Sequence, residues 1–231
     1  MASGHHSEPP GDSDDAAGGS GGPRVVVTGA AGFIGSHLVG RLLDDGADVV
    51  GVDNLDPWYA PERKAANAAA SLLVDGYRLH DVDLLSLDLV SLLTGVDTVY
   101  HLAARPGVQD SWGSGFAATC HLNVAMTQHL FEACLAAGVG RVVLASSSSV
   151  YGDGAASGRR EIAPVSPYGV SKAAAEQLAA VYGRRGLDVV SLRYFTVFGP
   201  RQRPDMAMHR LFASCLGGPV FRKRGTGDQQ R

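Results

Sequence analysis

The sequence predicts a doubly wound α/β fold, in which helices cover both faces of a parallel sheet. Three observations support this prediction. Short runs rich in valine alternate with longer helical patterns, and such alternation is typical of parallel strands joined by crossover helices. The strand-like runs are almost continuously apolar, as strands buried on both faces are. The first run leads directly into a glycine-rich turn and then a helix, which is common at the start of such folds.

The predicted elements follow one another in a regular order. RVVVT, beginning at Arg24, predicts a strand, a helical pattern runs from Phe33 to Asp44, and ADVVGVD predicts the second strand. The stretch Pro57–Ser71 predicts a loop that leads into an alanine-rich helix. The later elements are the strand DTVYHLAA, a helix over 117–137, the strand RVVLASSSS, a helix over 167–184 and the strand LDVVSLRY.

The chain is expected to contain three segments. Residues 1–22 include almost nothing that could be buried, so they predict a disordered leader. Residues 23–198 hold all the alternating elements and predict the main domain. The alternation stops after Pro200, so residues 199–231 predict the beginning of a smaller, different region.

The composition narrows the classes of partner. The 20 basic and 23 acidic residues are interspersed and give a formal net charge of -3, so we expect neither nucleic acid nor an anionic membrane as a partner. No apolar run approaches the roughly 20 residues that a membrane span requires. Cys120, Cys134 and Cys215 show no metal-binding or disulfide spacing, which is typical of reduced thiols. We therefore expect a cytoplasmic protein that binds small molecules and no metal.

The glycine-rich turn predicts a dinucleotide site. Gly29, Gly32 and Gly35 permit a tight turn, close approach of a pyrophosphate and close packing of helix on strand, and the helix N-terminus faces the phosphates. Asp53 ends the second strand, near the position expected for the carboxylate that binds the adenosine ribose. A carboxylate there repels a 2′-phosphate, so NAD is predicted in preference to NADP. The alternative interpretation of Asp53 is a turn or capping residue.

The segment Gly-x-x-Gly-Phe-Ile-Gly at residues 29–35 resembles the motif of extended short-chain dehydrogenases, the NAD-dependent epimerase/dehydratase family. The resemblance runs from Arg24 to Arg231 and implies a Rossmann fold with NAD bound in residues 23–198. It also implies further residues against the cofactor, with Asn123 stabilising the pocket and the active-site helix. These residues are Phe33, Ile34, Asn54, Asp83, Leu84, Leu102, Ala103, Ala104, Asn123 and Tyr194.

A tyrosine and a lysine four residues apart predict a proton-transfer pair. Tyr168 and Lys172 lie in a helical segment opened by Ser166 and Pro167, so both side chains share one helix face. A phenol has a pKa of about 10, and its anion could be stabilised by the ammonium, the helix N-terminus and the nicotinium ring of NAD. We expect Tyr168 to accept a hydroxyl proton from the substrate, which the resemblance implies is a sugar. The alternative is a half-buried aromatic with a solvated lysine.

A serine cluster precedes this helix at residues 146–149. By the resemblance, Ser147 is the catalytic hydroxyl, which hydrogen-bonds the reacting sugar oxygen. Ser148 and Ser149 are adjacent alternatives, and Ser148 is also expected to contact the substrate. Both Tyr168 and Lys172 are expected to contact the cofactor as well as to take part in catalysis.

The segment SSVYG lacks the Asp-Glu pair of nucleotide-sugar 4,6-dehydratases and the Glu of sugar-acid decarboxylases. The resemblance therefore implies a nucleotide-sugar 4-epimerase. Such an enzyme oxidises the sugar at C4, passes through a 4-keto intermediate, and returns the same hydride from bound NAD to the opposite face.

The segment Arg193–Ala207 resembles the corresponding segment of UDP-glucuronate 4-epimerases, as does DNLDPWYAPERKAAN near the second strand. UDP-glucuronate is then the expected substrate and UDP-galacturonate the product. A guanidinium matches a sugar carboxylate in bidentate geometry, so we expect Arg203, with Thr196, to hold it. The resemblance places Arg231 at the substrate diphosphate. The alternative for Arg203 is an exposed loop residue.

The last residues resemble the start of a strand that continues in the family, so the substrate region is expected to be incomplete. One alternative function is therefore binding of NAD and a nucleotide sugar without turnover, and another is a UDP-glucose/galactose 4-epimerase. The resemblance also implies a homodimer, formed through the helices expected over residues 117–137 and 167–184.

Overall fold

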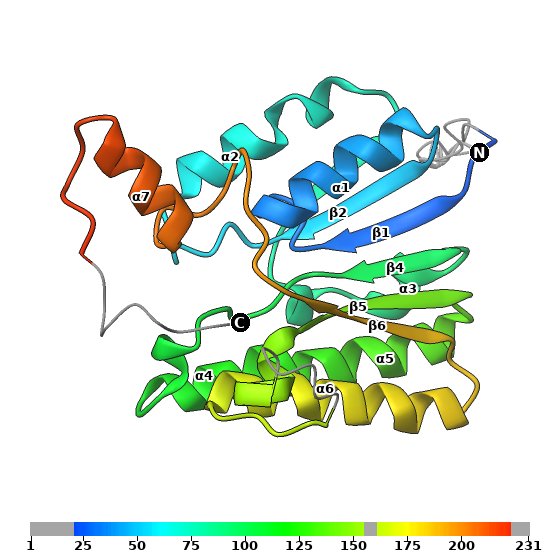
Figure 1. Ribbon diagram of the computed structural model, residues 1–231. Coiled ribbons are helices and arrows are strands. Elements are labelled where there is room, and N and C mark those ends of the chain that lie inside the picture. The colour runs from blue at the N-terminus through cyan, green and yellow to red at the C-terminus, as the bar shows by residue number, and fades with distance from the viewer. Residues whose placement is uncertain (1–20, 155–160, 223–231) are drawn as a thin grey trace, which may run out of the picture.

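A computed structural model describes residues 21–154 and 161–222 of the chain. These residues form a parallel sheet in the strand order β3-β2-β1-β4-β5-β6 (Figure 1). The order reverses between β1 and β4, and in doubly wound folds ligands bind at that switch. The strands are β1 Arg24–Thr28, β2 Asp48–Asp53, β3 Tyr77–Asp81, β4 Thr98–His101, β5 Arg141–Ser147 and β6 Val189–Tyr194.

Helices cover both faces of the sheet, as the sequence predicts (Figure 1). Alternate side chains of one strand serve the two sides: Val25 and Val27 pack toward α1, whereas Val26 packs in the cluster that includes Phe131 of α5. The helices are α1 Phe33–Asp44, α2 Pro61–Ala69, α3 Leu89–Leu93, α4 Gly115–Cys120, α5 Met126–Ala137, α6 Pro167–Arg184 and α7 Ala207–Cys215. The predicted doubly wound α/β fold is confirmed.

The helix expected over residues 117–137 is interrupted by a change of hydrogen bonding. It begins at Gly115 and passes through a π-helical turn, His121–Ala125, before continuing as α5. Such π-helical turns are rare and often mark functional sites. The turn contains Asn123, whose side chain reaches the neighbouring loop and helix described below.

The segment after β6 crosses the carboxyl ends of the strands and packs on α1 (Figure 1). His37 hydrogen-bonds the carbonyl oxygen of Pro200 at 3.0 Å, and Arg201 donates to the carbonyl oxygen of Ser36 at 3.1 Å. The chain then forms α7. The predicted leader lies outside the described residues up to position 20, as does Arg231. Within the described part of the chain, no helix has the length and apolar character needed to cross a membrane.

Candidate active site

A cleft of about 1160 Å³ lies where the carboxyl ends of the strands meet the loops that follow them. Its walls come from the loops after β1, β2, β3, β4, β5 and β6 and from α6 and α7. The site residues that the sequence predicts all line this cleft, except for Asn123, which lies behind it, and Arg231, which is not described. The structure thus brings residues from both halves of the sheet into one cavity at the β1/β4 switch.

The turn between β1 and α1 has no room for side chains at two of its glycines. Gly29 has a φ of +70°, and a Cβ there would lie 2.8 Å from the amide nitrogen of Ala103. A Cβ on Gly35 would lie 2.1 Å from the carbonyl oxygen of Gly29. The turn is therefore as tight as a dinucleotide site needs, with the N-terminus of α1 directed at the cleft.

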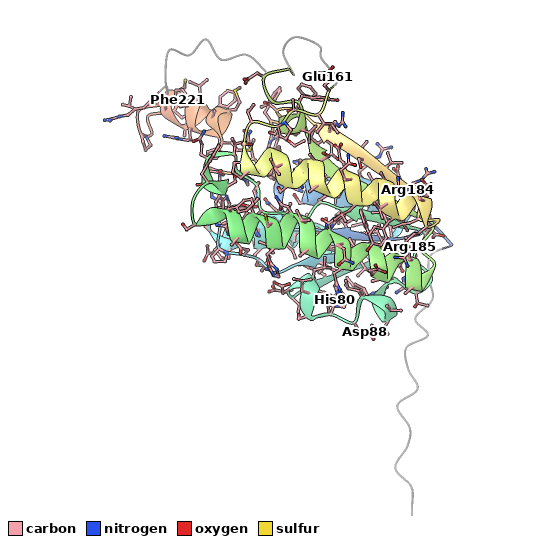
Figure 2. All side chains as sticks on the ribbon, turned by 90° about the horizontal axis from the view of Figure 1, so that it is seen from below. His80, Asp88, Glu161, Arg184, Arg185 and Phe221 are labelled. Carbon is pink, nitrogen blue, oxygen red and sulfur yellow. The ribbon has the colours of Figure 1, made fainter. Side chains whose placement is uncertain are left out.

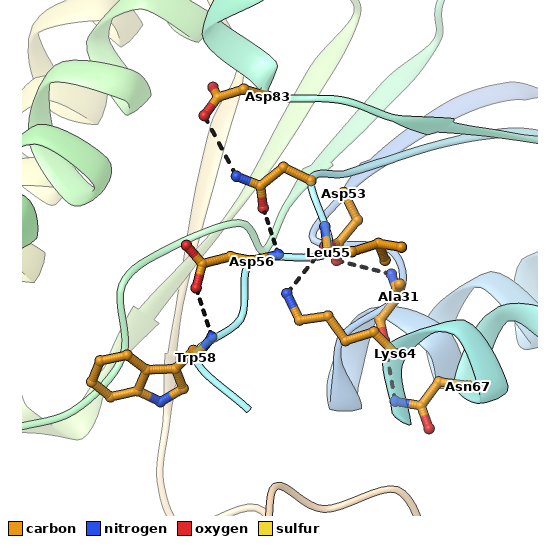
Figure 3. Close-up of polar contacts among 9 residues, drawn as sticks. Ala31, Asp53, Leu55, Asp56, Trp58, Lys64, Asn67 and Asp83 are labelled. Carbon is orange, nitrogen blue, oxygen red and sulfur yellow. Dashed lines mark hydrogen bonds and ion pairs between the residues drawn. The ribbon is translucent and has the colours of Figure 1, made fainter. Parts of the chain in front are cut away.

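The Asp53 carboxylate, at the end of β2, is buried against the glycine turn (Figure 3). One oxygen accepts a hydrogen bond from the Ala31 amide at 3.1 Å, and the other accepts from the Leu55 amide at 2.9 Å. The ammonium of Lys64, on α2, lies 3.2 Å from the second oxygen and is itself buried. Asp53 therefore fixes the turn, which agrees with its interpretation as a turn residue. It also lines the cleft, at the position where the sequence predicts a carboxylate for the adenosine ribose.

Short polar side chains order the loop that follows β2 (Figure 3). The Asn54 side chain contacts Asp83 at 3.5 Å and accepts from the Asp56 amide at 3.1 Å. Asp56 in turn accepts from the Trp58 amide at 2.9 Å. These contacts place the Trp58 indole in the cleft, where the guanidinium carbon of Arg105 lies 4.2 Å from its ring centroid.

Asn123 connects the loop after β4 to the helix that carries the tyrosine and lysine. Its side-chain oxygen accepts from the Arg105 amide at 2.7 Å, and its nitrogen donates to the Arg105 carbonyl and to Ser171, both at 3.0 Å. The residue is buried. Asn123 thus does not line the cleft itself, and it acts by holding two of the elements that do.

The tyrosine and lysine lie together at the start of α6, on the cleft wall. Ser166 caps the helix by accepting from the Gly169 amide at 3.0 Å, and the Tyr168 amide donates to Ser111 at 3.0 Å. Lys172 is buried, and its ammonium donates to the carbonyl oxygen of Ala145 at 2.9 Å. Burial lowers the pKa of Lys172 to about 8. The alternative of a solvated lysine is therefore wrong.

The serines at the end of β5 have different partners. Ser146 donates to the carboxylate of Glu176, which is also bound by both ends of the Arg193 guanidinium, at 2.9 and 2.7 Å. Ser147 faces the cleft and accepts from the Ser149 amide at 3.1 Å. The Ser146 hydroxyl is thus used in the contact with Glu176, and Ser146, Ser147, Ser148 and Ser149 all line the cleft.

The two residues proposed for the sugar carboxylate both line the cleft, on the segment after β6. The Arg203 guanidinium is already paired with a carboxylate of its own chain, since it donates twice to Asp205, at 3.1 Å each. Thr196 lies in the same wall. The bidentate geometry expected of Arg203 is thus present, with Asp205 as its partner.

Sequence reasoning assigned no role to several polar residues of this region. Lys64 and Trp58 lie in the segment near the second strand that resembles UDP-glucuronate 4-epimerases. Their spacing in the sequence does not reveal that they reach Asp53 and Arg105. His101 is buried between the hydroxyls of Thr28 and Thr127, at 2.8 and 3.1 Å. Burial, together with the charge of Lys172, lowers the pKa of His101 to about 3, so its ring is neutral at physiological pH.

Comparison with known proteins identifies the family. Residues 25–231 match the model of the NAD dependent epimerase/dehydratase family. The chain is 44% identical over 212 residues to an uncharacterized UDP-glucose epimerase, YtcB, of Bacillus subtilis, covering 90% of this chain and 67% of that protein. It is 33% identical to the UDP-glucuronate 4-epimerase of Thermodesulfobacterium geofontis, covering 89% of this chain and 66% of that protein.

A solved structure has a similar fold. The UDP-glucuronic acid 4-epimerase from Bacillus cereus, in complex with UDP-glucuronic acid and NAD, superposes with a TM-score of 0.81 at 43% identity. The match covers 84% of this chain and 63% of the Bacillus cereus chain, so the present chain spans less than two thirds of that enzyme. Because the family model matches residues 25–231, the chain belongs to the NAD-dependent epimerase/dehydratase family.

Proposed function

We propose that this protein is an NAD-dependent nucleotide-sugar 4-epimerase that converts UDP-glucuronate to UDP-galacturonate. The observation that carries the proposal is the convergence of the glycine turn, Ser147, Tyr168 and Lys172 on one cleft. In this proposal residues 23–198 form the NAD-binding domain with its catalytic pair, and residues 199–231 belong to the region that binds the nucleotide sugar. The relatives named above are the second line of support.

The cleft fits the cofactor. A side chain at Gly29 or Gly35 would collide with the protein's own backbone, so glycine keeps the turn tight, and the N-terminus of α1 and the turn amides suit the diphosphate. Asp53 and Asn54 would hold the adenosine ribose, Asp83 and Leu84 the adenine, and Leu102–Ala104 the middle of the dinucleotide. Tyr168, Lys172 and Tyr194 would hold the nicotinamide end. Bound NAD supplies a hydride acceptor that later returns the hydride.

The protein's own residues handle the proton. With a pKa of about 8, Lys172 is mostly charged at pH 7, and it lies one helical turn from Tyr168 on the same helix face. Its charge and the N-terminus of α6 both favour the phenolate. Tyr168 then takes the proton of the sugar hydroxyl at C4. It returns this proton after the 4-keto sugar has rotated in its pocket. Ser147 holds the same sugar oxygen by a hydrogen bond.

The sugar carboxylate is assigned to Arg203 and Thr196. The guanidinium already binds a carboxylate in fork geometry, which is the geometry that glucuronate requires. To bind there, the substrate carboxylate replaces Asp205. The Bacillus cereus complex with UDP-glucuronic acid supports this substrate.

A second candidate substrate is UDP-glucose, and a specific observation favours it. The charge of Arg203 is already balanced by Asp205, so a neutral sugar can be accommodated without breaking that ion pair. MoeE5, which is 46% identical, has been solved in complex with UDP-glucose and NAD. Binding of NAD and sugar without turnover is the remaining alternative.

Product analysis separates these functions. Purified protein is incubated with UDP-glucuronate, and UDP-galacturonate is sought by chromatography, with UDP-glucose assayed alongside. We expect product from UDP-glucuronate and none from Tyr168→Phe. Equal turnover of UDP-glucose would contradict the role of Arg203. If neither protein forms product but denaturation releases NAD, the chain is a binding protein without turnover.

We also propose a cytoplasmic homodimer that pairs through α5 and α6. The two helices lie side by side on one face of the molecule (Figure 2), and α6 exposes Val170 and Val181 there. Sedimentation of the wild type should give twice the mass of the chain, and Val181→Asp should give the single-chain mass. A monomeric wild type would refute the pairing.

A further inference from the structure

The side chains of Arg105 and Trp58 meet across the cleft. Arg105 belongs to the loop after β4, and Trp58 belongs to the loop after β2. In the sheet these two strands flank β1, so the pair spans the point where β1 ends and the glycine turn begins. The guanidinium carbon lies 4.2 Å from the indole centroid, within cation–π range.

The Arg105 guanidinium has donor capacity to spare. Its Nε is buried and has no hydrogen-bond partner, and among the ion pairs of the described residues none includes Arg105. Buried donors in native proteins are nearly always satisfied. An anionic oxygen is the strongest acceptor for a guanidinium, and the Arg105 side chain lines the cleft.

The other cations around the inner cleft already have partners. Lys64 is bound to Asp53, Lys172 donates to a backbone carbonyl, and Arg203 is bound to Asp205. Arg210 and Arg222 also line the cleft, but both are exposed, on α7 and beyond it. Among the described residues, Arg105 is therefore the inner cation whose side chain has no hydrogen-bond or ion-pair partner in the protein.

Both members of the pair are held in position before any ligand arrives. Asn123 binds the amide and the carbonyl of Arg105, while Asp56 holds the Trp58 amide. Such preorganisation reduces the entropy lost on binding. Stacking on an aromatic face also favours arginine over lysine at this position.

We propose that Arg105, supported by Trp58, binds the diphosphate of the dinucleotide from the side opposite the glycine turn. The proposal rests on the proposed NAD site. The turn amides and α1 then bind one face of the diphosphate, and the guanidinium binds the other. The loops after β2 and β4 thereby close over the cofactor and slow its release.

Calorimetric titration of cofactor-free protein tests this role without any assay of turnover. Arg105→Gln should weaken NAD binding about 10- to 100-fold, as expected for a hydrogen bond to a charged group. Binding of adenosine, which has no phosphate, should be unchanged. Arg184→Gln removes an exposed cation at the end of α6 (Figure 2) and should leave both affinities unchanged.

Trp58→Leu and the double variant test the support that the indole gives. Because both residues act on one contact, the two losses should not add, and Arg105→Lys should fall between wild type and Arg105→Gln. Circular dichroism melting verifies that each variant is folded.

Two results would overturn the proposal: an unchanged NAD affinity in Arg105→Gln, or an equal loss of affinity for adenosine and for NAD. The wild-type titration is read first. If the wild type binds NAD but does not turn over the sugar, the epimerase proposal is refuted, and the Arg105 and Trp58 variants still decide this inference. If the wild type binds no NAD, both proposals are refuted.

Discussion

Gly35 and Gly40, both in α1, differ sharply in the room that the structure leaves for a Cβ. Gly35→Ala places a Cβ 2.1 Å from a carbonyl oxygen, so we expect the free energy of unfolding to fall by about 3 kcal/mol. NAD binding should be lost as well. Gly40→Ala, in the same helix, meets nothing within 4 Å and should stabilise by about 0.5–1 kcal/mol. Urea unfolding measures both, and equal effects would contradict this account of the turn.

Lys172 yields a pH prediction. Burial lowers its pKa from 10.5 to about 8 in the folded chain. Between these values the unfolded chain holds more protons, so this residue makes stability rise with pH, by at most about 1.4 kcal/mol per unit. Below pH 8 the contribution is constant.

The matched variant for this measurement is Lys172→Met, which keeps the length of the side chain. Unfolding free energies of both proteins are measured from pH 7 to 10.5. We expect the difference between wild type and Lys172→Met to shift in favour of wild type above pH 8. A difference that stays constant over this range would show that the pKa of Lys172 is not lowered in the folded chain.

At the scale of elements, Asn123 ties a loop and α6 to the π-helical turn. Asn123→Ala leaves three polar groups without their partner, so we expect a loss of about 2–4 kcal/mol and faster hydrogen exchange at the start of α6. Asn67 is also buried but donates one bond, to Ala31, and Asn67→Ala should cost about 1 kcal/mol. An equal cost for both would mean that the connection to α6 carries no stability.

Elements with a strong local pattern were predictable from sequence, and elements defined by distant partners were not. The unit from Arg24 to Asp53 has continuous valine runs and a glycine turn, so its strands and helix have the predicted bounds, with β2 beginning one residue later. Strand β3 lies at the sheet edge and is mostly polar, so only its pairing with β2 defines it. The π-helical turn leaves no trace in the apolar pattern of its helix.

The site divides in the same way. The glycine turn and the pair Tyr168 and Lys172 depend on spacings of three and four, which a sequence displays. The contact of Trp58 with Arg105 joins residues of two loops, and only the sheet order brings those loops together. The pairing of Arg203 with Asp205 depends on side-chain conformation, which spacing does not reveal.

At the scale of the whole molecule, the cleft joins loops from both halves of the sheet, so ligand binding should stabilise the entire fold. A ligand that binds only the folded chain adds RT ln(1 + [L]/Kd), which is about 2.7 kcal/mol at a concentration of 100 Kd. NAD should therefore raise the melting temperature of the wild type. NADP should raise it less, because its 2′-phosphate meets the buried carboxylate of Asp53.

The decisive comparison is between wild type and Asp53→Asn, each melted with NAD and with NADP at equal concentrations. Removing the carboxylate's charge should narrow the difference between the two cofactors, because it removes the repulsion. Lys64 remains beside this position, 3.2 Å from Asp53 in the wild type, and its released ammonium should then favour the 2′-phosphate. If NAD and NADP already stabilise the wild type equally, Lys64 neutralises Asp53 completely and the carboxylate exerts no cofactor selection.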